Sequence, residues 1–175
     1  MSSLSRLRVP LGYLFGLAAL ALARPEPFSL LLGLPLAALG ETVRLWASGH
    51  IEKTAALATG GPYAHTRNPL YLGSVLLGVG FAVASWSPWV ALAVLAYFAV
   101  FYPAAIRGEA AFLAGKFGDE YAAWARAVPA FLPRLAPAGP RASRFEWRRV
   151  RRNREWRTAL ALPVALLLLW LRARL

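Results

Sequence analysis

The sequence contains no cysteine among its 175 residues and only eight acidic residues. The absence of cysteine excludes disulfides, a thiolate nucleophile and cysteine ligands for a metal ion. The only two histidines, His50 and His65, are too few for a histidine-based zinc site without carboxylate help. Charged residues make up 16% of the chain, less than in an average soluble domain. This shortage of charge fits an integral membrane protein better than a soluble one.

Apolar residues are abundant instead, at 58% of the chain with a mean hydropathy of +0.48. They gather in five segments, at 9–23, 28–46, 70–86, 88–106 and 158–171. A helix needs about 20 residues to cross the hydrocarbon core, so the first and last segments are short for a span. The sequence predicts an all-α, polytopic membrane protein with about five transmembrane helices. We expect a single domain over 1–175, with a motif core at about 40–133, a basic segment at 134–157 and a C-terminal apolar helix at 158–172.

The positive charge is nearly all arginine and gives the chain a formal net charge of +12. Nucleic-acid binding is one explanation, but the arginines border apolar segments, as the positive-inside rule describes. Twelve basic residues lie between Arg107 and Arg157. With five spans, this pattern predicts that the N-terminus and the functional site are cytoplasmic, with membrane lipids and no nucleic acid as partners. The bias toward leucine, alanine and arginine, with little lysine and no cysteine, favours a bacterial inner-membrane protein. Arg172 and Arg174 would then lie outside, unless the last apolar segment lies in the interface.

The segment 108–128 has apolar residues at spacings of three and four, which predicts an amphipathic helix on the cytoplasmic face. Pro129 and Pro133 are expected to stop it. The arginine-rich run at 148–154 then predicts a stretch that contacts lipid headgroups.

A polar, turn-rich segment at 60–73 lies between the second and third apolar segments. Polar groups near a membrane span are costly unless they are buried in protein or line a cavity. The segment therefore predicts a binding site. Pro69 is expected to begin the third helix, because its missing N–H is harmless in the first turn, and Asn68 is expected near the N-cap. The candidate residues are Tyr63, His65, Arg67, Asn68, Pro69 and Tyr71.

Two blocks of residues resemble the isoprenylcysteine carboxyl methyltransferase and phospholipid methyltransferase family, a group of integral membrane methyltransferases. The first block is Gly-Pro-Tyr at 61–63, Arg-Asn-Pro at 67–69, then Tyr71 and Gly73. The second is Glu109, Leu113, Phe117-Gly118, Glu120-Tyr121, Trp124 and Val128-Pro129. Both blocks occur in the family's order and at its separation, which makes the resemblance far more specific than either block alone.

The chain departs from the family pattern at two positions. The family commonly has histidine where this chain has Asn68, and asparagine cannot titrate near neutral pH. A mechanism that needs a histidine base at this position therefore does not fit the chain. The family often has a second glutamate where this chain has Ala110, so that Glu109 alone carries the carboxylate role.

The resemblance implies a pocket for S-adenosylmethionine at the cytoplasmic ends of the last core helices. In that pocket Glu109 would accept hydrogen bonds from the ammonium or the ribose, and Arg67 would pair with a carboxylate. Tyr63 and Tyr71 would offer aromatic faces to the adenine or the sulfonium. Arg67 and Glu109 are the expected catalytic residues, and Glu41 and Arg44 the expected substrate residues. The expected cofactor-binding residues are Tyr63, His65, Arg67, Asn68, Pro69, Tyr71 and Glu109.

Simpler explanations exist for several of these residues. Arginines at a membrane boundary often only reach toward the headgroups, and the tyrosines fit an aromatic belt. His65 is better explained as an ordinary loop residue than as a base. Glu41 is equally consistent with an ion pair to Arg44, three residues further along one helical face.

The function implied by the resemblance is S-adenosylmethionine-dependent methyl transfer to a lipophilic small-molecule or lipidated acceptor. A carboxylate acceptor is favoured because it is already a nucleophile, whereas an amine needs a base such as Glu109 or His65. Two alternatives stay open: a nicotinamide-dependent membrane reductase of the sterol reductase type, and a non-catalytic membrane scaffold or lipid-binding protein. The sequence does not indicate the oligomeric state.

Overall fold

The computed structural model describes residues 16–52, 56–138 and 143–174, and every regular element in these ranges is helical. The prediction of an all-α protein is therefore confirmed for the described part of the chain. The elements are α2 (Pro27–His50), η1 (Gly61–Ala64), α3 (Pro69–Ser85), α4 (Pro88–Ala127), α5 (Trp147–Arg152) and α6 (Trp156–Arg172). Residues 16–22 are also helical, and residues 9–15 of the first apolar segment predicted at 9–23 lie outside the described residues.

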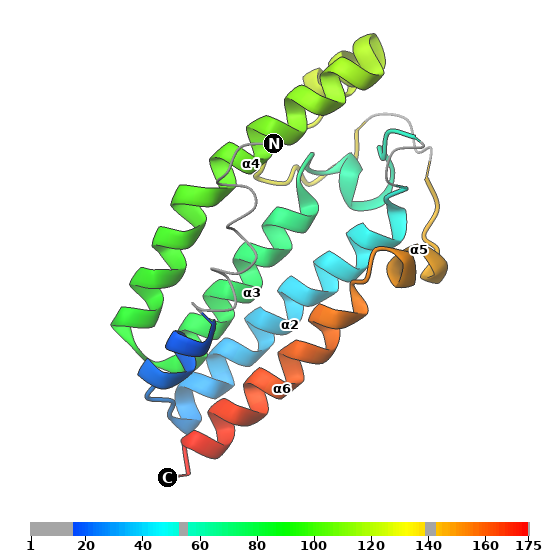
Figure 1. The fold of residues 1–175 in the computed structure, drawn as a ribbon. Helices are drawn as coiled ribbons and strands as arrows, with labels where there is room; N and C mark the ends of the chain where they lie inside the picture. Colours follow the sequence, from blue (N-terminus) through cyan, green and yellow to red (C-terminus); the bar gives the residue numbers. More distant parts are fainter. Residues whose placement is uncertain (1–15, 53–55, 139–142, 175) are drawn as a thin grey trace.

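The four long helices lie side by side, with α2 between α3 and α6, and α4 against the other side of α3 (Figure 1). Helices α2 and α3 pack closely because glycines face each other where they cross. A Cβ atom added to Gly40 would lie 2.6 Å from the Gly73 carbonyl oxygen, and one added to Gly33 would lie 2.4 Å from that of Gly80. Small residues of this kind allow two backbones to approach within a membrane.

Prolines begin both α3 and α4, as predicted for Pro69. At this position no backbone donor is lost from the helix. Asn68 is the N-cap residue of α3, but its side chain makes no capping hydrogen bond. Its amide has another partner, which is described with the site below.

The predicted amphipathic helix at 108–128 is the end of α4 and not a separate element. Gly108 has a helical backbone, and the alanine-rich sequence around it favours continuation of the helix. The helix is interrupted at Gly118, whose φ of 49° is accessible to glycine at little cost. Beyond this point the chain turns back, so the end of α4 folds over itself above the other helices (Figure 1). Helix α4 ends at Ala127, just before the predicted stop at Pro129.

Two described helices, α2 with 24 residues and α4 with 40, are long and apolar enough to cross a membrane. Many of their leucine and tryptophan side chains are exposed, as on a lipid-facing surface. Helices α3 and α6 have 17 residues each, which is at the lower limit for a span. The structure thus supports membrane association, and the number of five spans stays a prediction.

The folded-back end of α4 is held to the polar segment by a small core. Its buried members are Ala47, Leu57, Tyr63, Tyr121, Trp124 and Val128. This core joins the end of α2, the η1 turn and the end of α4, and it thereby brings the two sequence blocks together.

Candidate functional site

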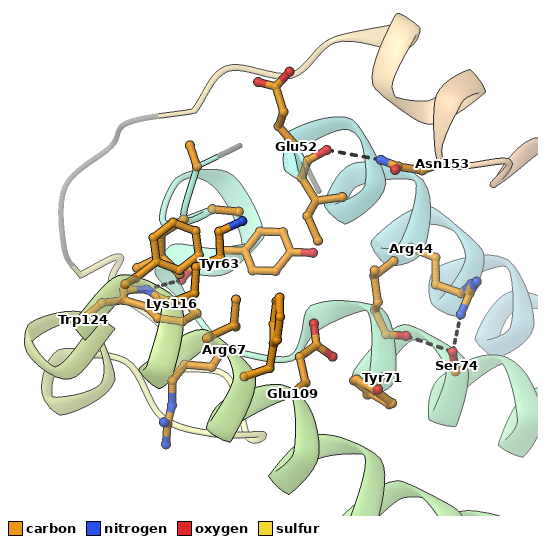
Figure 2. Close-up of a pocket in the computed structure, with 18 of the residues that line it drawn as sticks. Arg44, Glu52, Tyr63, Arg67, Tyr71, Ser74, Glu109, Lys116, Trp124 and Asn153 are labelled. Atoms are coloured by element: carbon orange, nitrogen blue, oxygen red, sulfur yellow. Dashed lines mark hydrogen bonds between the residues drawn. The ribbon is translucent and has the colours of Figure 1, made fainter. Parts of the chain in front are cut away.

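A cavity of about 630 Å³ lies where the two sequence blocks meet (Figure 2). Its volume is within the range of about 300–1,000 Å³ that is typical of small-molecule sites. Helices α2, α3 and α4, the η1 turn and the junction of α5 and α6 all contribute to its wall. Five of the predicted site residues line it, namely Arg44, Tyr63, Arg67, Tyr71 and Glu109.

Tyr63 occupies the centre of one wall, with its ring 5% exposed and its hydroxyl directed into the cavity (Figure 2). The Trp124 indole nitrogen donates a 3.1 Å hydrogen bond to the Tyr63 carbonyl oxygen and holds the turn in place. The Tyr63 hydroxyl has no hydrogen-bond partner among the described residues. Burial, followed by the negative charges of Glu109 and Glu155, raises the pKa of this phenol above its usual value, and Arg44 opposes the rise. The hydroxyl is thus a protonated donor without an acceptor.

Glu109 extends from α4 into the cavity, opposite Tyr63 (Figure 2). Phe112, Leu113 and Lys116 line the cavity from the same helix. These residues follow Glu109 at positions i+3, i+4 and i+7, so they form one face of α4. This face combines a carboxylate, an ammonium and two apolar side chains.

Arg67 lines the cavity with its stem, while its guanidinium points away from Glu109 (Figure 2). Its Nη1 donates a 3.2 Å hydrogen bond to the Tyr121 hydroxyl, and its Nε is buried without a partner among the described residues. Its backbone N–H donates to the Pro129 carbonyl oxygen at 2.9 Å. In this structure Arg67 therefore holds the end of α4, and its guanidinium group is not directed toward a ligand in the cavity.

Three predicted cofactor residues, His65, Asn68 and Pro69, do not line the cavity. His65 Nδ1 lies 2.8 Å from the Arg134 carbonyl oxygen, and Asn68 Nδ2 donates to the Ala130 carbonyl oxygen at 2.7 Å. Pro69 is buried at the start of α3. The chain after α4 returns along the polar segment and takes up the hydrogen bonds of His65 and Asn68. That these three residues bind the cofactor stays a prediction.

Arg44 and Glu41 lie together on α2, as expected from their spacing, but their contact is long. Arg44 Nε is 3.9 Å from Glu41 Oε2. Arg44 binds Glu155 much more closely, with Nε and Nη2 at 2.7 and 2.6 Å from Glu155 Oε1, and it also donates to the Ser74 hydroxyl. Glu41 lies behind the cavity wall and does not line the cavity.

The sequence leaves the roles of Asn153 and Glu155 in the arginine-rich run open, and the structure places both in the cavity wall. Asn153 Nδ2 donates to the carbonyl oxygens of Ser48 and Ile51 at the end of α2, at 2.9 and 3.2 Å. In the sequence, Asn153 and Glu155 are distinguished only as an amide and a carboxylate among the arginines that precede the last apolar segment. This position does not indicate which distant helix the two side chains contact.

Tyr97 and Tyr102 were also missed, because the fourth apolar segment was interpreted only as a span. Both line the cavity from α4 beside Tyr71. The Tyr71 and Tyr102 rings meet edge to face at 5.0 Å. The cavity therefore has an aromatic wall on the side of the apolar part of α4.

The described residues contain no group of three or more histidine, cysteine, aspartate or glutamate side chains placed to hold a metal ion.

Comparisons with known proteins cover the first block and the second block as far as Glu120. Residues 35–120 match the family model described as phospholipid methyltransferase. The cobalt-zinc-cadmium resistance protein CzcN of Cupriavidus metallidurans is 42% identical over 115 residues, which cover 63% of this chain and 52% of that protein. The nickel-cobalt-cadmium resistance protein NccN of Alcaligenes xylosoxydans xylosoxydans is 38% identical over 108 residues, which cover 61% of this chain and 49% of that protein. The chain thus spans about half the length of these relatives. No solved structure matches it.

Proposed function

We propose that this chain, whose residues 35–120 belong to the phospholipid methyltransferase family, transfers a methyl group from S-adenosylmethionine to a lipophilic acceptor at the membrane surface. The observation that carries the proposal is the cavity itself. Tyr63 from the first block and Glu109 from the second line the same cavity, and both belong to the matched residues 35–120.

The residues present fit the chemical groups of this cofactor. The Glu109 carboxylate suits the ammonium and the ribose hydroxyls as an acceptor of hydrogen bonds. The buried Tyr63 phenol, which has no acceptor among the described residues, suits an oxygen of the ribose. The aromatic side chains of Tyr63, Tyr71 and Trp124 suit the adenine and the positive sulfur. When bound, S-adenosylmethionine supplies a methyl group on a cationic sulfur; a bond forms from acceptor to methyl carbon, and the S–C electron pair stays on the resulting neutral thioether. The chain contributes the alignment of the cofactor with its acceptor.

We favour a carboxylate acceptor, which forms an ester without losing a proton. Neither Asn68 nor His65 lines the cavity, so neither offers a base there. The anchor of such a carboxylate differs from the one expected, because Arg44 binds Glu155 and Arg67 binds Tyr121. Lys116 is a third cation that lines the cavity. For an amine acceptor, Glu109 is the base best placed to accept the proton.

The surroundings of the cavity support an acceptor and partners drawn from the membrane. The exposed apolar side chains of α2 and α4 suit a bilayer, and the arginines of α5 suit anionic headgroups at its surface. Trp147 and Trp156, which flank these arginines, are 67% and 47% exposed, as in an interfacial belt. We propose a bacterial inner-membrane protein with its site on the cytoplasmic side. The names of the two relatives refer to metal resistance of longer proteins, and the proposal for this chain rests on the family and the cavity.

The experiment that tests this function is calorimetric titration of the detergent-purified, folded protein with S-adenosylmethionine and, separately, with reduced NADP. Binding of S-adenosylmethionine alone is the expected result. Binding of reduced NADP alone would favour the membrane reductase, and binding of neither would favour the non-catalytic scaffold.

A further inference from the structure

Three charged side chains form a buried cluster where α2 meets α6. Glu41, Arg44 and Glu155 have side chains that are 8%, 19% and 8% exposed. The cluster contains one cation and two carboxylates, so it has a surplus of one negative charge when both carboxylates are ionised. Burial makes an uncompensated negative charge costly, so a buried carboxylate either takes up a proton or is stabilised by a nearby cation.

The described residues do not compensate this surplus. The close bonds of Arg44 go to Glu155 and Ser74, while its contact with Glu41 is 3.9 Å long. Both carboxylate oxygens of Glu41 are buried and have no hydrogen-bond partner among the described residues. One arginine thus serves two carboxylates and fully satisfies only one of them.

The cluster borders the cavity through Arg44, Ser74 and Glu155, with Glu41 behind them. An independent feature of the same cavity also indicates a missing ligand, because the buried Tyr63 hydroxyl points into it without a partner (Figure 2). The charge of Glu155 reaches this hydroxyl, since it contributes, after burial and Glu109, to the raised pKa of the Tyr63 phenol. Glu155 and Arg44 of the cluster therefore both act on the cavity, and they act in opposite directions.

We propose that the surplus negative charge of the Glu41–Arg44–Glu155 cluster selects the cationic sulfonium cofactor over the neutral thioether product. The proposal rests on the proposed function and adds residues from the C-terminal segment, beyond the matched residues 35–120. Methyl transfer removes the positive charge from the sulfur, so the attraction to the cluster is lost when the product forms. Glu155 and Glu41 thereby favour exchange of the product for fresh cofactor. Glu155 also adds a carboxylate to the lining of the cavity, in a chain that has Ala110 where the family often has a second glutamate.

The test is a comparison of two affinities in each variant. Calorimetry measures the dissociation constants of S-adenosylmethionine and S-adenosylhomocysteine for wild type, Glu155→Gln and Glu41→Gln, all as full-length protein in detergent. Each substitution removes one negative charge at nearly constant shape, and Glu41→Gln leaves the Arg44–Glu155 pair intact. Glu146→Gln is the matched control, because Glu146 pairs with Arg149 at 2.8 Å, is 41% exposed and does not line the cavity.

We expect both cluster variants to lower the preference for the sulfonium by about fivefold or more, since a unit charge acts strongly at low effective dielectric. The control should keep the wild-type ratio. A purely structural role of the cluster would weaken both ligands equally and leave the ratio unchanged. An unchanged ratio in Glu41→Gln, whatever Glu155→Gln shows, would overturn this inference alone. Failure of folded wild type to bind either compound would instead overturn the proposed function.

Discussion

Arg44 in α2 and Glu155 at the start of α6 are 111 residues apart, and their side chains form an ion pair with a distance of 2.6 Å between Nη2 and Oε1. The pair ties the C-terminal helix to the part of the chain that carries the cavity. Because it is mostly buried, its removal has a different cost from that of a surface pair.

Arg44→Ala is expected to lower the free energy of unfolding by about 3–5 kcal/mol, because it leaves the buried carboxylates of Glu41 and Glu155 without their cation. Thermal unfolding in detergent measures the loss. Glu146→Ala, which breaks a more exposed pair with Arg149, should cost less than about 1 kcal/mol. Equal losses in the two variants would show that the Arg44–Glu155 pair is not a structural tie.

Tyr63→Phe is expected to separate binding from stability. The hydroxyl that it removes has no partner among the described residues, so its loss should leave the unfolding temperature unchanged or slightly raised. If a ligand group accepts from this hydroxyl, the affinity for S-adenosylmethionine should fall roughly three- to tenfold, the equivalent of one hydrogen bond. Calorimetry beside thermal unfolding checks both halves. An unchanged affinity would remove the hydroxyl from the site.

Glu109→Gln is expected to weaken S-adenosylmethionine binding about tenfold, or roughly 1.4 kcal/mol, because the cavity loses a carboxylate that lines it. Glu120→Gln is the matched control, since Glu120 is an exposed residue of the same helix and does not line the cavity. Affinities that change alike in the two variants would point to the overall charge of α4 and not to this position.

The helix starts could be predicted from the sequence, because they depend on the residue type at one position. Pro69 and Pro88 begin helices because proline fits a first turn wherever the rest of the chain lies. Tyr63 and Glu109 each belong to a block of the family pattern, and both lie in residues 35–120, which match the phospholipid methyltransferase model, so that their meeting at one cavity was predictable. The sequence did not predict which distant backbone takes up the donors of the polar segment. Asn68 and Thr66 bond the carbonyl oxygens of Ala130 and Phe131, and nothing in the local spacing distinguishes these contacts from cofactor contacts.

The hydrogen bond between Asn68 and Ala130 predicts a role for Asn68 in stability. Asn68→Ala removes a hydrogen bond to the Ala130 carbonyl oxygen and should cost about 1 kcal/mol of stability. The affinity for S-adenosylmethionine should change less than about twofold, because Asn68 does not line the cavity. A large loss of affinity at unchanged unfolding temperature would restore Asn68 to the binding residues.

The close packing of α2 on α3 predicts opposite effects for two glycine substitutions. A Cβ atom at Gly40 would lie 2.4 Å from the Leu77 backbone nitrogen, an approach that only movement of one helix can relieve. Gly40→Ala should therefore destabilise the protein by about 1–3 kcal/mol, as overpacking does. At Gly115 in α4 nothing lies within 4 Å of such an atom, so Gly115→Ala should stabilise the helix by about 0.5–1 kcal/mol. Since Gly40 is one turn before Arg44, Gly40→Ala should also weaken the binding of S-adenosylmethionine by displacing the Arg44–Glu155 wall of the cavity. Thermal unfolding and calorimetry on the two variants measure these effects. Equal changes in unfolding temperature for Gly40→Ala and Gly115→Ala would contradict the close contact of α2 with α3.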